Sequence, residues 1–479
     1  MPNAFSRFLV ARRLFSAGAL LIAADGGLAQ AQRPSLVGFE GTFAYQGDSR
    51  ILLVARDSML FAVLDDARYP LRFLGNDRFL NAGGDTIPFQ RGPGGDVSGF
   101  TERGVFFARL SPRVDPAVVT AVRARPRPLG ADGRTAAYIY RRPPEMRDGL
   151  ATADAADAGL DSATLGRIVA GVVDGKYPDL HSLLVWRRGK LVAEEYFYEY
   201  HRQLPHQMRS ATKSVVSALV GIAIDHGLIA SDTERVTPLL PYDGYANPDP
   251  RKARLTLRDL LTMRSGFACD DWNGDSPGNE SKMYHSADWP KFVLDLPMID
   301  APGTKASYCS GNVGIAGRIV ERAAKTSLPA FAEQQLFAPL GIGDVRWNYT
   351  LTSSNAATFG QVYLRPRDML KLGILFHQHG MWNGRQVISR AWVDRSTATW
   401  SHIGDQDYGY FWWHQWIDVA TPAGTKRVDM VLATGNGGQK IYLIPSLDAV
   451  VVMTGGNYNT NSPSTAIMRS ELLPALLAR

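Results

Sequence analysis

Two pairs of apolar, β-branched segments lie at opposite ends of a long stretch rich in helical patterns. The first pair is 181–186 with 191–197, and the second is 441–444 with 449–453, each joined by a short turn. Runs of this length and composition are typical of strands connected as hairpins. Strands at both ends of a domain with helices between them predict an antiparallel sheet that the two ends complete together.

The N-terminal third of the chain has a different pattern. Short apolar segments such as 51–55 and 59–64 alternate with clusters of Gly, Asn and Asp, which is typical of short strands and tight turns. We expect a small all-β accessory domain, a barrel or a sandwich, over residues 36–123. The Pro-, Ala- and Asp-rich stretch 124–159 is predicted to be a linker, and the larger domain is expected over 160–479.

The first residues have the layout of an export signal. Arginines at 7, 12 and 13 precede an apolar run over 14–24 and then the small-residue sequence Ala29-Gln30-Ala31. A basic start, a short apolar run and an A-x-A site are typical of a secretory signal peptide, and the run is shorter than the roughly 20 residues that span a bilayer. We expect residues 1–31 to be removed on export, by a route left open. The mature protein would then be periplasmic or secreted, without a stable membrane span.

Composition excludes several classes of protein. The 479 residues include two cysteines, too few for a disulfide framework or a Cys-rich metal site. Whether Cys269 and Cys309 pair is left open. The net charge is +6, but the basic residues are scattered among acidic ones, which does not indicate a nucleic-acid partner. The nine histidines show no metal-binding spacing, so neither a metal nor a cofactor is expected.

A Ser-x-x-Lys motif opens the most apolar helix predicted in the chain. Ser210 and Lys213 precede apolar residues that cover most of the helix circumference up to Gly227, and such a helix is buried. Residues three apart share one face, so the ammonium can reach the hydroxyl, and the helix N-terminus favours negative charge on the serine oxygen. Burial lowers the pKa of a lysine, which would let Lys213 accept the serine proton.

Two later segments can complement this serine. Tyr308 lies in a loop before a predicted amphipathic helix, and a tyrosine beside a lysine can shuttle a proton, since a nearby cation favours phenolate. The glycine-rich segment 433–439 precedes the strand at Ile441. Its glycines allow a ligand to lie close to the backbone, and an N–H at this strand edge could help to hold an oxyanion.

These motifs, in this order, resemble the serine β-lactamase/penicillin-binding-protein superfamily, in particular its esterase, class C β-lactamase and 6-aminohexanoate-dimer hydrolase branch. The resemblance covers about residues 160–479. The motifs that carry it are Ser210-Ala211-Thr212-Lys213, the segment 255–266, Asp271-Trp272, the segment 286–289, Pro302-Gly303, Tyr308-Cys309-Ser310, the segment 408–413 and Gly435-Asn436-Gly437-Gly438-Gln439. It implies an α+β fold of the β-lactamase/transpeptidase type, with an antiparallel sheet flanked by helices and a helical subdomain.

The resemblance also implies roles for individual residues. Ser210 would be the acylated nucleophile, with Lys213 and Tyr308 as its proton-transfer partners. The backbone N–H groups of Ser210 and Asn436 would form the oxyanion hole. Substrate-binding positions would be Ser310, Gly435, Gly437, Trp272 and Trp412. More broadly, at least two of six aromatic residues are expected to line the cleft, namely Trp272, Tyr284, Trp289, Tyr408, Trp412 and Trp413.

The chain departs from the family pattern at two positions. Ala433-Thr434-Gly435 aligns with the K-T-G triad, so the cation that holds a β-lactam carboxylate is absent. Ser310 takes the place of the usual asparagine after the tyrosine, unless the register shifts to Asn312. Both departures favour an ester or small-amide hydrolase over a β-lactamase.

Three functions are therefore considered. The leading one is an exported serine hydrolase, esterase or amidase, that acts on small molecules through an acyl-enzyme. The alternatives are a non-catalytic ligand-binding or sensor protein on the same scaffold, and a β-lactamase or D-Ala-D-Ala peptidase. Cys309 as the nucleophile is disfavoured because no histidine lies near it in sequence. The natural substrate, the role of the β domain and the oligomeric state are left open.

Overall fold

The structure of the protein is a computed structural model that describes residues 35–45, 49–130, 132–348 and 361–478. The export signal predicted over residues 1–31 lies outside these residues. Within the described ranges, no helix combines the length and the apolar character that a bilayer-spanning helix needs.

The N-terminal β region is a closed eight-stranded barrel, in which β1 pairs with both β2 and β8. Its strands are β1 (Gly41–Ala44), β2 (Arg50–Arg56), β3 (Met59–Leu64), β4 (Ala67–Gly75), β5 (Arg78–Leu80), β6 (Thr86–Arg91), β7 (Val97–Glu102) and β8 (Val105–Ser111). Phenylalanines fill the interior, where the ring centroids of Phe39 and Phe79 are 4.9 Å apart. Of the two architectures expected for this region, the barrel is the one formed.

The segment between the barrel and the larger domain contains one short helix, α1 (Pro116–Val122). This helix lies within the range 36–123 predicted for the β domain. The predicted linker, 124–159, begins after it and has little regular structure in its described residues, yet its second half is held against the larger domain. The Tyr140 hydroxyl donates to the Val192 carbonyl at 3.0 Å, and the Leu191 N–H donates to the Ala151 carbonyl at 2.8 Å. This half therefore runs along an edge of the main sheet.

The larger domain is built on an eight-stranded sheet in the order β10-β9-β21-β20-β19-β18-β17-β16, and every pairing in it is antiparallel. The N-terminal hairpin joins the C-terminal strands where β9 pairs with β21, which confirms that both ends of the domain complete one sheet. The strands are β9 (Leu180–Arg187), β10 (Lys190–Tyr196), β16 (Ser401–Ile403), β17 (Gln406–Tyr408), β18 (Trp413–Thr421), β19 (Gly424–Gly435), β20 (Gln439–Ile444) and β21 (Ala449–Gly455).

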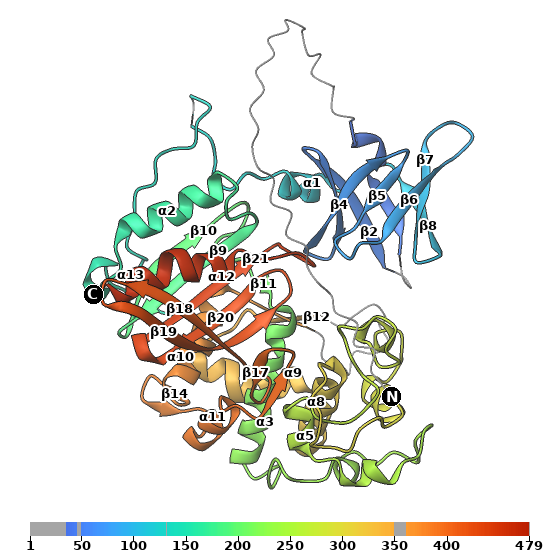
Figure 1. Ribbon diagram of the computed structural model, residues 1–479, viewed down its shortest axis with the longest axis vertical. Coiled ribbons are helices and arrows are strands. Elements are labelled where there is room, and N and C mark those ends of the chain that lie inside the picture. The colour runs from blue at the N-terminus through green and yellow to red at the C-terminus, as the bar shows by residue number, and fades with distance from the viewer. Residues whose placement is uncertain (1–34, 46–48, 131, 349–360, 479) are drawn as a thin grey trace, which may run out of the picture. The chain divides into compact units, whose positions relative to one another are not determined.

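Helices cover the sheet and form the region between its two ends (Figure 1). The helices are α2 (Ser162–Val173), α3 (Thr212–Asp225), α4 (Val236–Leu239), α5 (Leu257–Leu261), α6 (Glu280–Met283), α7 (Trp289–Leu294), α8 (Ser310–Ala324), α9 (Leu328–Ala332), α10 (Pro366–His377), α11 (Arg390–Ser396), α12 (Ser464–Ile467) and α13 (Leu473–Leu477). Smaller sheets are β11 (His206–Gln207) with β13 (Gln361–Leu364) and β12 (Arg346–Asn348), and β14 (Met381–Trp382) with β15 (Arg385–Gln386). The α+β fold expected from the sequence is confirmed.

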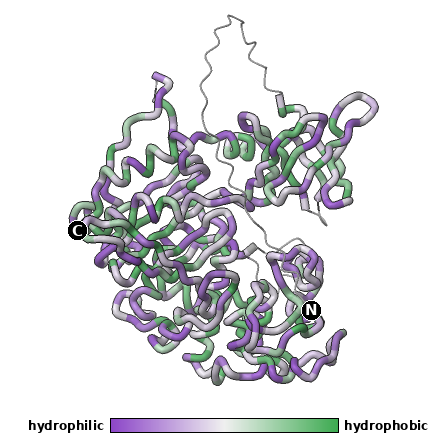
Figure 2. Tube along the Cα trace, viewed as in Figure 1, coloured by the Kyte–Doolittle hydropathy of each residue, from purple (hydrophilic) through white to green (hydrophobic). Residues whose placement is uncertain are grey.

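The hydropathy of the chain explains why these elements pack as they do. Hydrophobic segments follow the central strands and α3 in Figure 2. Strand β9 is buried along its whole length, and so is α3 up to its last two residues. Because α3 is buried, its N-terminus lies inside the domain.

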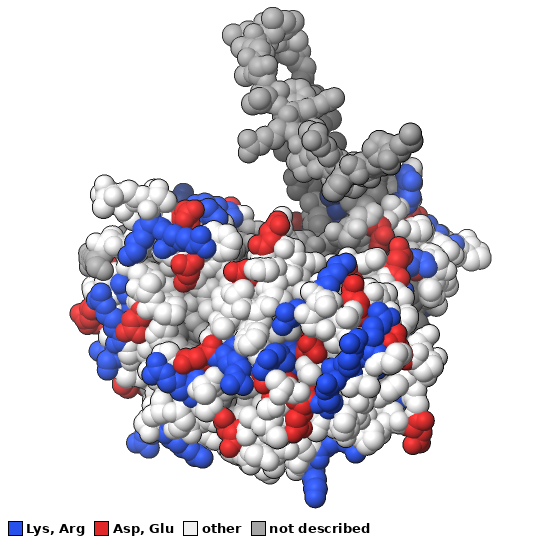
Figure 3. Space-filling view, turned by 60° about the horizontal axis from the view of Figure 1, so that its bottom comes forward, with Lys and Arg blue, Asp and Glu red and all other residues white. Residues whose placement is uncertain are grey.

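The surface charges are mixed. Lys and Arg are interspersed with Asp and Glu on the face drawn in Figure 3, so charges of one sign do not dominate that face.

Candidate active site

Ser210 and Lys213 meet at the N-terminus of α3. Ser210 lies in the single 3₁₀ turn Arg209–Ala211 that leads into this helix. Lys213 is buried, and its Nζ donates a hydrogen bond to Ser210 Oγ at 3.0 Å. The contact expected from the three-residue spacing is present, which places a cation on the hydroxyl that the motif marks as nucleophile.

The charge state of Lys213 differs from the expectation. Burial lowers the pKa of Lys213, but Tyr308, Glu280 and Asp271 outweigh burial, so the pKa stands above its ordinary value. The expected lowering of this pKa by burial is outweighed, because Tyr308 and two carboxyl groups from distant parts of the chain lie near the ammonium. At neutral pH the side chain is an ammonium, suited to stabilise negative charge on a neighbouring oxygen.

Tyr308 lies two residues before the start of α8, and its ring faces Lys213. The Lys213 Nζ is 4.9 Å from the ring centroid. Trp272 and Trp413 pack on the same ring, each with its centroid 5.5 Å away. The neighbouring Cys309 is disulfide-bonded to Cys269, which answers the question left open by the sequence and removes Cys309 as a free thiol. The structure thus brings Ser210, Lys213 and Tyr308 together.

Two carboxylates border this group. Asp271 accepts the Ser310 N–H at 2.6 Å on one oxygen and the Glu280 N–H at 2.9 Å on the other. Burial and the nearby Glu280 raise the pKa of Asp271 to about 6, against the opposing effects of Lys213 and Ser310. Glu280 Oε2 accepts hydrogen bonds from the hydroxyls of Ser310 and Tyr284, both at 2.9 Å. The site therefore holds one ammonium beside two carboxyl groups.

The end of β19 approaches the nucleophile segment closely. A Cβ built on Gly435 would lie 2.2 Å from the Met208 carbonyl oxygen and 2.9 Å from Arg209 Cβ, so only glycine fits there. Gly437 has φ +93° and packs on Tyr458 in the turn that follows. The Asn436 side chain donates to Asn459 Oδ1 at 2.6 Å and accepts the Asn459 N–H at 2.9 Å. These contacts fix the backbone on which the predicted oxyanion donor lies.

A small cavity of about 60 Å³ opens beside Ser210. Its walls come from the 3₁₀ turn Arg209–Ala211 and from α3, α6, α7, α8 and β13. The lining residues are Arg209, Ser210, Thr212, Lys213, Glu280, Met283, Tyr284, Trp289, Ser310, Val313, Gly314 and Gln361. Two of the six aromatic residues expected at the cleft, Tyr284 and Trp289, are among them. The nucleophile, the cation and Ser310 therefore face one space, of a size that suits a small group of a substrate.

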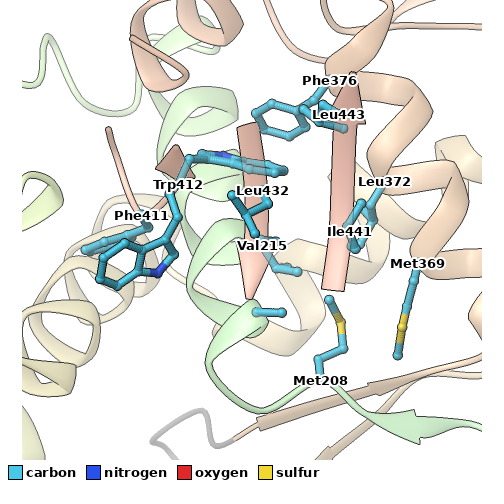
Figure 4. Close-up of a cluster of buried hydrophobic side chains, with 14 of the residues drawn as sticks. Met208, Val215, Met369, Leu372, Phe376, Phe411, Trp412, Leu432, Ile441 and Leu443 are labelled. Atoms are coloured by element: carbon cyan, nitrogen blue, oxygen red, sulfur yellow. The ribbon is translucent and has the colours of Figure 1, made fainter. Parts of the chain in front are cut away.

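The structure corrects one predicted binding residue. Trp412 is only 1% exposed and belongs to the core, where its ring lies 4.5 Å from that of Phe376 (Figure 4). It therefore cannot contact a substrate as expected, because in the run 408–413 it turns toward α10. Trp272, by contrast, is 61% exposed beside Tyr308, although it does not line the small cavity.

The alternative register at Asn312 is not supported. Asn312 is buried in α8 and its amide contacts Met263 Sδ at 3.6 Å, away from the cavity that Ser310 lines. In the described part of the chain, no group of three or more His, Cys, Asp or Glu side chains could hold a metal ion.

Three polar residues that line the cavity lie outside the sequence motifs, namely Arg209, Glu280 and Gln361, and Asp271 lies in a motif but was given no role. Asp271 belongs to a pair that carried the family resemblance, and Arg209 directly precedes the nucleophile, so position in the sequence could have marked both. Nothing local marks Glu280 or Gln361. They reach the cavity through the fold of the loop around 267–300 and through β13.

Comparison with known proteins places this geometry in a family. A family model described as Beta-lactamase matches residues 169–469, more than half of the chain. The chain belongs to the beta-lactamase family. A 6-aminohexanoate-dimer hydrolase of Paenarthrobacter ureafaciens is 25% identical over 297 residues, which cover 57% of this chain and 71% of that protein. A lovastatin esterase of Penicillium rubens is 28% identical over 189 residues, which cover 35% of this chain and 45% of that protein.

Solved structures that align with this member of the beta-lactamase family share its fold. A family VIII carboxylesterase aligns with a TM-score of 0.52 and 17% identity over 66% of this chain and 97% of the other. A crystal structure of a β-lactamase-like protein from Bacteroides dorei aligns with a TM-score of 0.52 and 18% identity over 64% of this chain and 98% of the other. Together with the hydrolases among its sequence relatives, the family supports a serine hydrolase.

Proposed function

We propose that the protein cleaves ester or amide bonds of small molecules through an acyl-enzyme on Ser210. The observation that carries this proposal is the 3.0 Å hydrogen bond from Lys213 to Ser210 Oγ, at a helix N-terminus that faces a cavity. A hydroxyl held by a cation at such a terminus can bear the negative charge that a nucleophile must develop.

The steps follow from the neighbours of the serine. Ser210 Oγ attacks the carbonyl carbon while its proton passes to the Lys213–Tyr308 pair. The resulting oxyanion is held by the N–H groups of Ser210 and Asn436. When the bond to the leaving group breaks, the proton goes from the pair to that group. A water molecule then attacks the carbonyl carbon of the acyl-enzyme and gives its proton to the same pair. The bond to Ser210 Oγ breaks, the pair returns the proton to that oxygen, and the acid is released. The acceptor is the member of the pair that has given up its proton before the attack, and the positive charge then carried by the pair stabilises the developing oxyanion.

Departures from the penicillin-recognising pattern support esters and small amides as substrates. Ala433 is fully buried and brings no cation to the end of β19. Ser310 is engaged with Glu280. The hydrolase and esterase relatives support the same substrate class. The signal-like residues 1–31 and the Cys269–Cys309 disulfide support the further proposal that the enzyme works after export, since disulfides persist in oxidising compartments.

Turnover of p-nitrophenyl esters and p-nitroanilides, measured on the wild type and on Ser210→Ala, tests the proposed function. We expect a pre-steady-state burst with at least one ester and a fall of about 10³-fold or more in Ser210→Ala. One equivalent of product without turnover would favour the binding or sensor alternative instead. Faster opening of a chromogenic cephalosporin than of any ester would favour a β-lactamase. Retained activity in Ser210→Ala would reject Ser210 as the nucleophile.

A further inference from the structure

Arg209 precedes the nucleophile and lines the same cavity. Its guanidinium lies 4.8 Å from the ring centroid of Tyr458 and 5.8 Å from that of Tyr69. It donates one hydrogen bond, from Nη2 to the Tyr69 hydroxyl at 2.5 Å. Aromatic rings thus fix the position of this cation without neutralising it.

Three other enclosed arginines of the chain pair with carboxylates, while Arg187 donates to two backbone carbonyl groups. Arg367 and Arg127 donate to the carboxylates of Glu194 and Glu195, at 2.7 and 2.5 Å, and Arg68 pairs with Glu199. Arg209 makes no ion pair with any residue that the structure describes, and its buried Nε has no hydrogen-bond partner there. A guanidinium carries five N–H donors, and the described residues accept a hydrogen bond from one of those of Arg209.

The backbone around Arg209 is held in an unusual shape. Arg209 has φ +50°, a left-handed conformation that non-glycine residues adopt rarely. Gly435 packs against this turn so closely that a Cβ there would strike Met208 and Arg209. Strained positions of this kind persist where the surrounding structure imposes them, commonly at functional sites. The side chain of Arg209 is therefore held in place by both its backbone and its aromatic neighbours, beside the cavity that this residue lines.

The other charges in the cavity do not compensate Arg209. Glu280 also lines the cavity, but its Oε2 is engaged by two hydroxyls and its charge acts on Lys213. At the end of β19, Ala433 stands where the family has a cation. Arg209 is thus a cation of this cavity that forms no ion pair with the described residues, and position 433 on the adjacent β19 supplies no second cation.

We propose that Arg209 binds a carboxylate of the substrate, which makes it a specificity-determining residue. This inference rests on the proposed function and adds the substrate class, namely esters or amides that carry a carboxylate near the scissile bond. The planar guanidinium fork matches a carboxylate with two parallel hydrogen bonds, and a pair formed in an enclosed site is stronger than one in water.

Paired substrates that differ only in charge test the proposal. For a carboxylate on the acyl side, the pair is mono-p-nitrophenyl glutarate and its methyl ester. For one on the leaving-group side, it is a phenyl butyrate with a ring carboxylate and the methyl ester of that compound. The measured quantity is the ratio of kcat/KM for the anionic over the neutral member, compared between variants so that intrinsic reactivities cancel. Arg390→Gln, at an exposed position of α11, is the control with the same change in net charge.

In at least one pair, Arg209→Gln should lower this ratio by about 10- to 100-fold, the effect of losing a hydrogen bond to a charged group. Arg209→Lys should lower it less, and Arg390→Gln should leave it unchanged. An unchanged ratio in both pairs, or an equal fall on anionic and neutral substrates, would overturn the proposal. Turnover of the neutral esters without any charge preference would reject this inference and leave the proposed function intact.

A binding measurement covers the case in which none of these substrates turns over. Glutarate should then raise the Tm of the wild type more than that of Arg209→Gln, because the ligand stabilises the form that binds it. Equal shifts in the two proteins would overturn the assignment of Arg209.

Discussion

Two buried charge clusters of the larger domain differ in how completely their charges are matched. The structural cluster consists of Arg202, Arg367, Glu194 and Asp148, joined by hydrogen bonds of 2.7 to 2.8 Å. The catalytic cluster consists of Lys213, Tyr308, Asp271 and Glu280, and its one ammonium has no ion pair within 4.0 Å among the described residues. Two cations match two carboxylates in the first, whereas one cation faces two carboxyl groups in the second.

The pKa values show what this difference means. Burial would raise the pKa of Glu194, but Arg367 and Arg202 lower it below its ordinary value. In the catalytic cluster, burial and Glu280 raise the pKa of Asp271 to about 6. The matched Glu194 stays ionised and serves the fold, while the unmatched Asp271 changes its protonation state near pH 6, as groups at functional sites commonly do.

The largest expected effect is on activity, from Lys213→Met. Removing the ammonium leaves the oxygen of Ser210 without its stabilising cation, so kcat/KM should fall by about 10³-fold. The side chain is buried and methionine is apolar with a similar reach, so the Tm should change little. Ester turnover and thermal unfolding measured together check both statements. Activity within a few-fold of the wild type would show that the cluster does not act as assigned.

The next largest effect is on stability, from Arg367→Met. This change leaves the fully enclosed Glu194 with Arg202 as its remaining ion-pair partner, and breaking a buried pair costs about 3–5 kcal/mol. We expect the free energy of unfolding in urea to fall by this amount, with unchanged kcat per folded molecule. Arg390→Met breaks an exposed pair on α11 and should cost less than about 1 kcal/mol. Equal losses of unfolding free energy in the two variants would contradict the claim that the buried ion pairs of Arg367 stabilise the fold more than the exposed pair of Arg390.

A moderate effect is expected on pH dependence, from Asp271→Asn. In the folded protein this carboxyl is protonated below about pH 6, whereas an ordinary aspartate ionises near 3.8. Both oxygens accept backbone N–H groups, which suits the ionised form. The kcat/KM of the wild type should therefore rise with pH through about 6, and Asp271→Asn should lose this inflection. An inflection that persists in the variant would assign the titration to another group.

The smallest effect is expected from Lys440→Met, which tests whether every unmatched buried charge is functional. Lys440 donates to Thr434 Oγ1, and burial lowers its pKa to about 8. Such a lysine costs stability below pH 8 and less as the pH rises toward 10.5, so Lys440→Met should raise the free energy of unfolding by about 1 kcal/mol at pH 7. Activity should stay unchanged. A loss of turnover would show that Lys440 acts through Thr434 on the neighbouring Gly435.

The parts of the fold with local periodicity were predictable from the sequence. The hairpin at β9 and β10, the strands β20 and β21 and the buried α3 follow from the spacing of apolar residues. A closed barrel was not separable from a sandwich, because closure depends on the pairing of β1 with β8, two strands with no sequence signal for each other.

Spacing alone predicted the site only where its residues are close in sequence, and the more distant Tyr308 and Ser310 were placed with the help of the family resemblance. The spacing of Ser210 and Lys213 predicts their contact because a helix fixes it. Asp271 comes from an irregular loop and Glu280 from the short helix α6 that follows it, so their effect on the pKa of Lys213 could not be anticipated. Trp412 was misplaced because the run 408–413 does not reveal which ring faces the core. Long-range loop geometry, which no local pattern encodes, set these outcomes.

The central claim is that Ser210 is an activated nucleophile, and intact-mass analysis after treatment with a fluorophosphonate tests it most directly. The wild type should gain one phosphonyl group, mapped by peptide analysis to Ser210, while Ser210→Ala should gain none and remain folded. Labelling of both proteins would place the nucleophile elsewhere. Failure of the folded wild type to react would contradict the account of an activated serine at the mouth of α3.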